Sequence, residues 1–272
     1  MSRSFLIASG KGGVGKSTLT ANLGAALVRN GSAVVIVDAD IGLRAQDVFL
    51  GLENSVVYDL IDVSNKDCSL EQALLECPSV PGLKLLPASQ FARVRDLSSG
   101  RLSKILEALK QAFDYVLIDS PAGIEKGFRN LLNAGTNEAI LITTPDDFSV
   151  RDVERAAHVF AAKQLPRPFL VVNRLDNELI RRKEMLPARV VADMLDLPLL
   201  GEIPEDPVVS RSILRRSLFI DFDCSARRAV LRIAGRLAGD TVPFPDIGSS
   251  RISLLHKLFP TVLKEVTSLE RH

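Results

Sequence analysis

The sequence predicts an α/β fold in which a doubly wound, mostly parallel sheet carries helices on both faces. Three observations predict it. A glycine-rich segment at residues 10–18 lies between an apolar run and a stretch with helical spacing. Short apolar runs rich in branched side chains recur along residues 33–172. Helical stretches separate these runs, and such alternation is typical of parallel sheets that are buried on both faces.

The first strand, loop and helix come in the order that a phosphate-binding loop requires. Residues 3–9 form an apolar run, and residues 19–27 repeat leucine and alanine at helical spacing until Asn30 and Gly31 end the helix. The loop between them matches the pattern G-x-x-x-x-G-K-[S/T] with the residues Gly10, Lys11, Gly12, Gly13, Val14, Gly15, Lys16, Ser17 and Thr18. These flanks argue against a glycine-rich surface turn. The sequence therefore predicts a nucleoside triphosphate site.

Each residue type in this loop suits the chemistry of phosphate. The glycines let backbone N–H groups approach phosphate oxygens, and the following helix directs its positive dipole end at them. Lys16 is placed to bridge the β- and γ-phosphates, and the Ser17 hydroxyl suits a hard Mg²⁺ ion. Lys11 is not required by the pattern and lies at the outer rim, where a phosphate on a second subunit is one candidate partner.

The remaining elements repeat the strand and helix alternation. Strands are expected at residues 33–37, 83–86, 115–118, 139–142 and 169–172, and helices at 102–112 and 150–163. In such sheets the chemistry gathers at the carboxyl ends of the strands. The polar residues that directly follow these predicted strands are therefore the candidates for the functional site.

Aspartates stand at two of those strand ends. Asp38 and Asp119 suit a magnesium ion held beside a phosphate loop, whereas Asp40 is better placed to orient or deprotonate an attacking water. Gly123 leaves a backbone N–H that can sense a γ-phosphate. Alternatively, the aspartates only cap the helices that follow, but their grouping beside a phosphate loop makes that reading weaker.

Residues after the last predicted strand are candidates for the nucleotide base. The amide of Asn173 can pair with N6–H and N7 of adenine, and Arg174 follows it. The segment Ile203, Pro204, Glu205 and Asp206 is a candidate for the other side of the base. The expected cofactors are thus ATP and Mg²⁺.

The overall composition limits the alternatives. The 34 basic and 33 acidic side chains give a net charge of +1, which offers no general attraction to nucleic acid. The three cysteines form no C-x-x-C pair, which favours a reducing compartment. We expect neither a signal peptide nor a spanning helix, because no apolar run is long enough.

Several segments together resemble the deviant-Walker-A ATPases, and within them the MinD family of cell-division site-selection ATPases. The segments are 10–18, 38–44, 119–125 with 127–128, 144–145 with 149–152, and 172–174. The likeness covers the chain to about residue 175 and continues weakly to Pro207. One departure is Ala45-Gln46-Asp47, where Asn-Leu-Asp would be expected. We expect this departure to affect partner contacts and to leave the ATP chemistry unchanged.

The resemblance implies an Mg²⁺-dependent ATPase that dimerises when ATP is bound. Lys11 would reach the ATP of the partner, Lys16 would hold phosphate, Asp40 would position the water and Asp119 would serve the metal. Gly123, Arg151 and Asp152 would face the dimer seam, where relatives meet regulators. Implied partners are division-inhibitor MinC-like and regulator MinE-like proteins and anionic lipids, and the implied location is cytoplasmic, peripheral on the inner membrane face.

The end of the chain differs in composition from the rest. We expect an ATPase domain at 1–240, a linker at 241–250 rich in proline, glycine and serine, and an amphipathic tail at 251–272. An apolar stripe with basic flanks is typical of a helix that lies on a membrane surface, although packing on the protein or a coiled coil is the alternative. Pro260 should break that helix. The residues expected at the membrane are Ile252, Leu255, Lys257, Leu258 and Phe259.

Two other functional classes share this fold. A ParA-type partition ATPase on DNA needs a basic patch that the near-neutral charge does not favour, and a related flagellar-placement ATPase stays open. A nitrogenase-type iron protein needs bridging cysteines at strand ends. Cys68, Cys77 and Cys224 do not follow the predicted strands, so that class is rejected.

Overall fold

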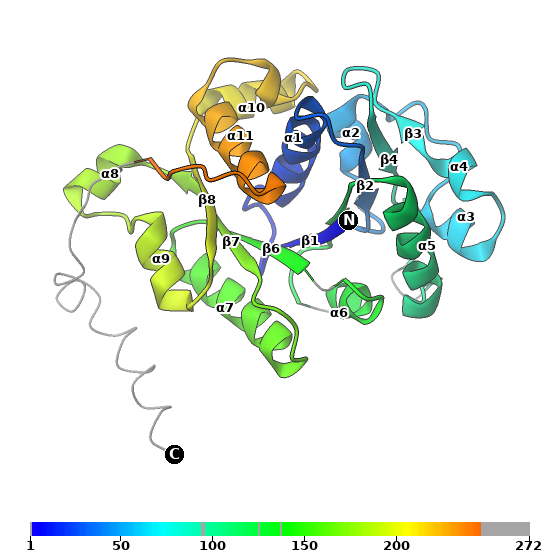
Figure 1. Ribbon diagram of the computed structural model, residues 1–272, viewed down its shortest axis with the longest axis horizontal. Helices are drawn as coiled ribbons and strands as arrows, with labels where there is room; N and C mark the ends of the chain where they lie inside the picture. Colours follow the sequence, from blue (N-terminus) through cyan, green and yellow to red (C-terminus); the bar gives the residue numbers. More distant parts are fainter. Residues whose placement is uncertain (1, 94–95, 125, 137, 246–272) are drawn as a thin grey trace.

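Eight strands form one sheet in the order β3-β4-β2-β5-β1-β6-β7-β8, as a computed structural model describes for residues 2–93, 96–124, 126–136 and 138–245 (Figure 1). The strands are β1 Arg3–Ala8, β2 Val34–Asp38, β3 Leu75–Glu76, β4 Leu83–Leu86, β5 Tyr115–Asp119, β6 Glu138–Thr143, β7 Phe169–Leu175 and β8 Leu199–Pro204. Only β3 pairs antiparallel among these strands. The predicted mostly parallel sheet is confirmed.

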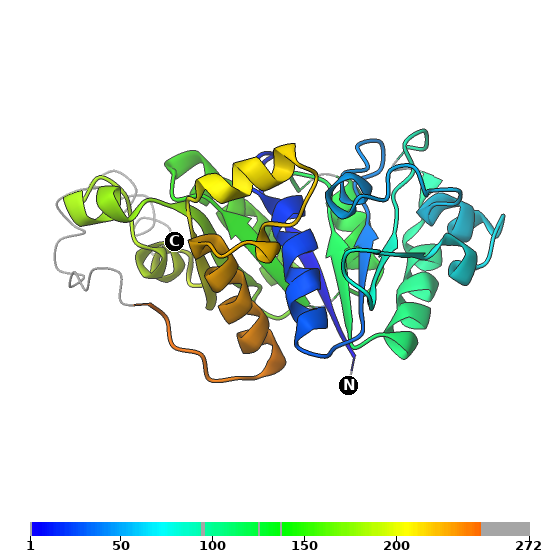
Figure 2. The same ribbon diagram turned by 90° about the horizontal axis from the view of Figure 1, so that it is seen from above.

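Helices cover both faces of the sheet, which confirms the doubly wound class. On one face lie α1 Lys16–Arg29, α2 Gln46–Leu50, α10 Pro207–Leu214, the short 3₁₀ helix η2 Phe219–Asp221 and α11 Ser225–Ala238. On the other lie α3 Leu60–Asn65, α4 Leu70–Ala73, α5 Ser99–Ala112, α6 Lys126–Asn133, α7 Asp147–Ala162, α8 Asn177–Arg182 and α9 Ala188–Leu195. Figure 2 shows α1 and α11 side by side over the same face.

Strand alternation divides the apolar side chains between two cores. In β1, Phe5 and Ile7 join the core under α1 and α11, whereas Leu6 and Ala8 join the core under α5, α6 and α7. All four side chains are fully buried. A strand buried on both faces is apolar at most positions, which explains why continuous apolar runs located these strands in the sequence.

The first helix follows its sequence signals closely. It begins at Lys16 after Gly15, whose φ of 96° lies in the left-handed region. It ends at Arg29, and Asn30 and Gly31 close it as predicted, with Gly31 at φ 89°. The phosphate-loop glycines therefore set both the turn and the direction of the helix behind it.

The structure differs from the sequence prediction at the end of β7 and in the presence of β8. The last predicted strand was expected to end at residue 172, but β7 continues to Leu175 through an irregular stretch in which Arg174 has φ 58°. Asn173 and Arg174 therefore lie inside a bulged strand and not after it. β8 was not expected as a strand, because Gly201, Glu202 and Pro204 interrupt its apolar run.

The first residues of the expected linker pack against the ATPase domain. The Arg236 guanidinium of α11 donates to the backbone carbonyls of Leu200 at 2.7 Å, Val242 at 3.0 Å and Pro243 at 2.9 Å. It also stacks on the Phe244 ring at 3.7 Å from the centroid. Residues 241–245 thus have defined partners.

The expected membrane residues, Ile252, Leu255, Lys257, Leu258 and Phe259, lie outside the described residues. Within the described ranges, no helix is both long and apolar enough to cross a membrane.

Candidate active site

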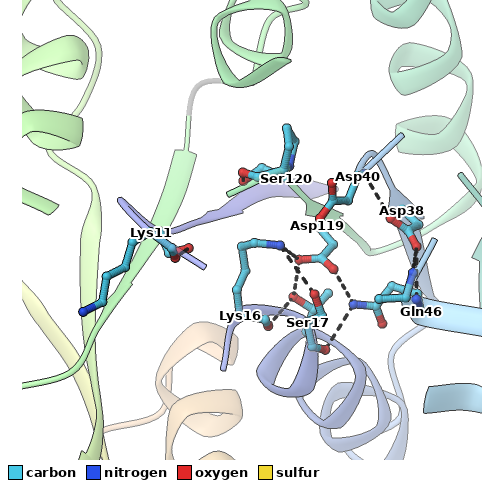
Figure 3. Close-up of polar contacts among 12 residues, drawn as sticks. Lys11, Lys16, Ser17, Asp38, Asp40, Gln46, Asp119 and Ser120 are labelled. Atoms are coloured by element: carbon cyan, nitrogen blue, oxygen red, sulfur yellow. Dashed lines mark hydrogen bonds and ion pairs between the residues drawn. The ribbon is translucent and has the colours of Figure 1, made fainter. Parts of the chain in front are cut away.

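The carboxyl ends of β1, β2 and β5 bring the predicted acidic and basic residues together. Asp38 and Asp119 are paired positions at the ends of adjacent parallel strands, and both are fully buried. Lys16 and Ser17 enter from the first turn of α1 (Figure 3). The sheet therefore assembles a cation, a hydroxyl and two carboxylates where strand-end logic placed them.

Lys16 is held by a buried ion pair. Its Nζ lies 2.7 Å from Asp119 Oδ1 and 3.5 Å from Ser17 Oγ. The Lys16 side chain is 7% exposed and that of Asp119 is 0% exposed. Thr20 Oγ1 also approaches Asp119 Oδ1, at 3.5 Å. A buried charge needs a partner of opposite charge, so this pair keeps the lysine in the loop.

Asp38 organises the backbone of the loop that follows β2. Its carboxylate accepts the N–H groups of Asp40, Ala45 and Gln46, each at 3.0 Å. Burial, together with the negative charge of Asp119, raises the pKa of Asp38 to about 7 although these donors oppose the shift. These three hydrogen bonds hold the backbone of residues 40–46 close to the Asp38 carboxylate.

Asp40 is less enclosed than the other two aspartates. Its side chain is half-buried, and Figure 3 shows it beside Asp119 and Ser120. Burial raises the pKa of Asp40, the positive charge of Lys16 lowers it and the charge of Asp119 raises it again. A half-buried carboxylate that solvent can reach suits the predicted role in positioning water.

The oxygen donors fit a magnesium ion that is shared with phosphate. Mg²⁺ takes hard oxygen ligands and is usually held by one or two carboxylates plus substrate phosphates. Ser17, Asp38 and Asp119 supply a hydroxyl and two carboxylates on the rim of the phosphate loop. Within the described chain, no group of three His, Cys, Asp or Glu side chains forms a metal cage. The residues present therefore fit an ion completed by phosphate oxygens.

Lys11 points away from Lys16 and from the buried carboxylates (Figure 3). Its Nζ lies 3.3 Å from Asp146 Oδ1, and the Lys11 side chain is 41% exposed. Burial raises the pKa of Asp146, but hydrogen bonds from Thr144, Ser149 and Lys11 outweigh it and the net shift is downward. The rim position predicted for Lys11 matches this arrangement, and its role across a dimer stays a prediction.

The start of the phosphate loop packs directly on α7. A Cβ at Gly10 would lie 2.2 Å from Asp152 Cβ and 2.4 Å from its carbonyl carbon, distances that real atoms do not share. Asp152 also pairs with Arg155 on the same helix. Asp152 is therefore a packing partner of the loop, and Arg151 beside it is exposed.

We expect Gly10→Ala to lower the free energy of unfolding by about 2 kcal/mol, because the new methyl group must displace α7 backbone. Gly12→Ala is the matched control, since the nearest atom to a Cβ there is Ala122 Cβ at 3.9 Å. Urea unfolding of both variants measures the difference. Equal stability of the two variants would contradict the contact between loop and helix.

Gly123 lies beside the start of the same loop, where a Cβ would be 3.8 Å from the Gly10 carbonyl oxygen. It has φ 84°, and its N–H donates to the Ser9 carbonyl at 3.0 Å. Sensing a γ-phosphate with this N–H would require that bond to be exchanged. The role of Gly123 stays a prediction.

A pocket beside α1 gathers the residues predicted for the base. It is lined by Gly15, Thr18, Leu19, Asn173, Arg174, Ile203, Pro204, Glu205, Asp206, Val209, Ser210, Ile213 and Phe219. Ile203 belongs to the segment predicted for the base, whereas the apolar side chains of Val209, Ile213 and Phe219 were not predicted, because α10 and η2 carried no distinct signal. An apolar wall with a few polar groups suits a purine ring.

Two of the predicted base contacts have structural partners here. Asn173 Nδ2 donates to the Val14 carbonyl at 2.8 Å, and a Cβ at Gly15 would lie 2.4 Å from that nitrogen. Asp206 caps α10 and holds α11, since its carboxylate accepts from Val208 N at 2.9 Å and Ser225 N at 2.9 Å. Both side chains thus shape the pocket through the elements around it.

Gln46 has contacts in the site that were not predicted from the sequence. It is fully buried, and its Nε2 lies 2.6 Å from Asp119 Oδ2. Asp47 is also buried and pairs with Arg44 at 2.7 Å. We expected the departure at residues 45–47 to leave the ATP chemistry unchanged, and the Gln46 contact makes that expectation testable.

Comparison with known proteins decides the family. The family model ParA, described as an NUBPL iron-transfer P-loop NTPase, matches residues 1–237. The septum site-determining protein MinD of Synechocystis sp. is 41% identical over 260 residues, covering 95% of this chain and 97% of its own. The chain belongs to the MinD family. Its relatives place it among the P-loop ATPases of cell-division site selection.

Solved MinD structures share the same fold. MinD of Aquifex aeolicus, in a MinC:MinD cell division protein complex, matches with a TM-score of 0.82 and 35% identity, covering 91% of this chain and 100% of that one. MinD of Pyrococcus horikoshii, complexed with Mg-ADP, matches with a TM-score of 0.78 and 31% identity, covering 89% and 100%. That relative therefore holds Mg-ADP on the fold that this chain shares with it.

Proposed function

We propose that this chain is a switch ATPase that dimerises with ATP, binds the inner membrane surface in that state, helps to select the division site and leaves the membrane on hydrolysis. The observation that carries the proposal is the division of labour between two lysines. Lys16 is buried against Asp119, whereas Lys11 is half-exposed and directed away from its own pocket. One lysine serves the bound nucleotide and the other is available to a second subunit.

The residues of the site would act in sequence on bound ATP. Lys16 exchanges Asp119 for the β- and γ-phosphates, with loop N–H groups and the α1 dipole on the same anions. Magnesium, when bound, neutralises phosphate charge beside Ser17, Asp38 and Asp119. Asp40 accepts a hydrogen bond from the attacking water and orients it toward the γ-phosphate. The pocket at Asn173 and Pro204 holds the adenine.

Dimerisation would follow from the charge of the triphosphate. A Lys11 ammonium on each subunit is attracted to the γ-phosphate of its partner, so the pair gains two charge-assisted contacts only while that group is present. Gly123, Arg151 and Asp152 lie on the same side of the loop and complete the proposed seam. Hydrolysis removes the contacts and separates the subunits.

Partners are proposed from the relatives. A MinD relative is solved in a MinC:MinD complex, so we propose a MinC-like division inhibitor and a MinE-like regulator as partners here. Recognition of a specific nucleic acid sequence is not part of the proposal, since the net charge is +1.

Membrane binding is proposed from the sequence of the tail. The apolar stripe of Ile252, Leu255, Leu258 and Phe259 with Lys257 beside it suits the surface of an anionic bilayer. A single short helix binds weakly, but a dimer carries two, and linking two sites raises retention by about 10² to 10⁴. The nucleotide state would thereby set membrane residence.

We expect the full chain to sediment with anionic liposomes in ATP and to stay in solution in ADP or without nucleotide. Truncation after Gly248 should abolish sedimentation while keeping the Arg236 contacts with residues 242–244. Leu255→Glu should also abolish it, whereas Ser253→Glu adds the same charge outside the stripe and serves as the matched control.

Each other outcome has a defined meaning. Equal sedimentation in ADP and in ATP would contradict the nucleotide-dependent switch. No sedimentation under any condition would contradict membrane binding. Duplex DNA in place of liposomes tests the ParA-type alternative, which requires ATP-dependent binding to DNA.

A further inference from the structure

Gln46 is a buried neutral side chain that contacts three parts of the site. It is the first residue of α2 and is fully buried. Its Nε2 lies 2.6 Å from Asp119 Oδ2 and 3.1 Å from the Ser17 carbonyl oxygen, and its backbone N–H donates to Asp38 Oδ2 at 3.0 Å. One residue thus donates to both buried carboxylates (Figure 3).

The chemistry of the neighbours fixes the orientation of this amide. A carboxylate oxygen and a carbonyl oxygen only accept hydrogen bonds, so the NH₂ group must face Asp119 and Ser17. The other end, Gln46 Oε1, is buried without a hydrogen-bond partner among the described residues. Burying an unpaired oxygen is unfavourable, so the two donated bonds are what hold a polar side chain at this position.

Asp119 is held from two sides as a result. Lys16 binds Oδ1 at 2.7 Å and Gln46 binds Oδ2 at 2.6 Å, so rotation of the carboxylate would break both contacts. The Gln46 backbone meanwhile helps to close residues 40–46 around Asp38. The loop that carries Asp40 is tied to the backbone of Asp119 by the Ala39 N–H, at 2.9 Å from the Asp119 carbonyl oxygen, and to the Asp119 carboxylate by Gln46.

We infer that Gln46 is a positioning residue of the magnesium-nucleotide site, fixing the Asp119 carboxylate and coupling it to the Asp40 loop. The inference rests on the proposed function, because it concerns the same site. A ligand-orienting hydrogen bond of this kind changes metal affinity by about ten-fold or more when it is removed. Gln46 does not touch the reacting atoms, so its effect must act through Asp119 and the loop.

The test measures ADP affinity in Mg²⁺ and in EDTA by calorimetry, and takes the ratio as the magnesium enhancement. We expect Gln46→Leu to reduce this enhancement by about ten-fold while ADP affinity in EDTA changes little. Gln111→Leu is the matched control, since Gln111 is exposed near the end of α5. That helix leads into β5, so its end lies at the opposite edge of the sheet.

The outcomes separate this inference from the proposed function. A natural chain that does not bind ADP would overturn the proposed function, and one that binds ADP equally well with and without Mg²⁺ would overturn the proposed magnesium site. If the natural chain shows the magnesium enhancement of ADP affinity and Gln46→Leu shows the same enhancement, the inference about Gln46 alone is overturned. A lower thermal midpoint of the variant would not change that conclusion. If Gln46→Leu does not fold, Gln46→Met, which keeps the length of the side chain, is measured in its place and decides by the same ratio.

Discussion

Lys16→Ala is expected to abolish ATP hydrolysis, with a loss of at least about a thousand-fold, because the group that compensates phosphate charge is gone. The same change leaves Asp119 buried without its cation. Removing one partner of a buried ion pair costs about 3–5 kcal/mol. We therefore expect Lys16→Ala to lower the thermal midpoint of the nucleotide-free protein by about 10 °C. Phosphate release and calorimetry measure the two effects.

A second substitution separates the two effects of Lys16. Asp119→Asn in the Lys16→Ala background removes the unpaired charge, so stability should recover in part while hydrolysis stays absent. Lys104→Ala is the matched control, since Lys104 is exposed on α5. A double variant no more stable than Lys16→Ala would show that the buried charge is not the cause.

Lys11→Ala is expected to keep nucleotide binding but to lose both the ATP-dependent dimer and hydrolysis. The side chain is 41% exposed and contacts Asp146 at 3.3 Å, so its removal should change stability by less than about 1 kcal/mol. A cation supplied to a transferring phosphate from a second subunit contributes about 10³-fold or more to the rate. Light scattering with ATP and phosphate release measure these losses.

The control for Lys11 is Lys163→Ala. Lys163 is exposed at the end of α7 and donates to Asn133 Oδ1 at 2.8 Å, so it matches Lys11 in charge and exposure without lying at the loop. If Lys11→Ala still forms the ATP-dependent dimer, Lys11 does not have the proposed role. The proposed explanation of why dimerisation depends on ATP would then be contradicted as well.

The central sheet was predictable because most positions of a strand buried on both faces are apolar. β2, β4, β5 and β6 match their predicted runs to within one residue at each end. β8 was not predicted because Glu202 interrupts its short apolar run. α11 was overlooked in the sequence, although its buried residues recur at helical spacing, as in Ala226, Ala229, Val230, Ile233, Ala234 and Leu237.

The site was predictable where charge and position coincide. Lys16, Asp38 and Asp119 are close together because parallel strands end at one edge, a rule that needs no coordinates. Gln46 was not predictable in the same way. A neutral amide has no charge from which the sequence could predict pairing with a carboxylate. Its contact also depends on the loop after β2, which brings Gln46 back to Asp38, eight residues earlier in the chain.

Gly10 packs directly on Asp152, so the phosphate loop and α7 are in close contact at this point. Gly10 has no side chain that could absorb movement, so a small shift of α7 would be transmitted to the loop backbone. Because binding equilibria are reciprocal, a partner that bound α7 near Arg151 and shifted it would change the affinity of the loop for phosphate, and phosphate would change the affinity for that partner by the same factor. Such coupling would pass through this one contact and would need no relay through the sheet.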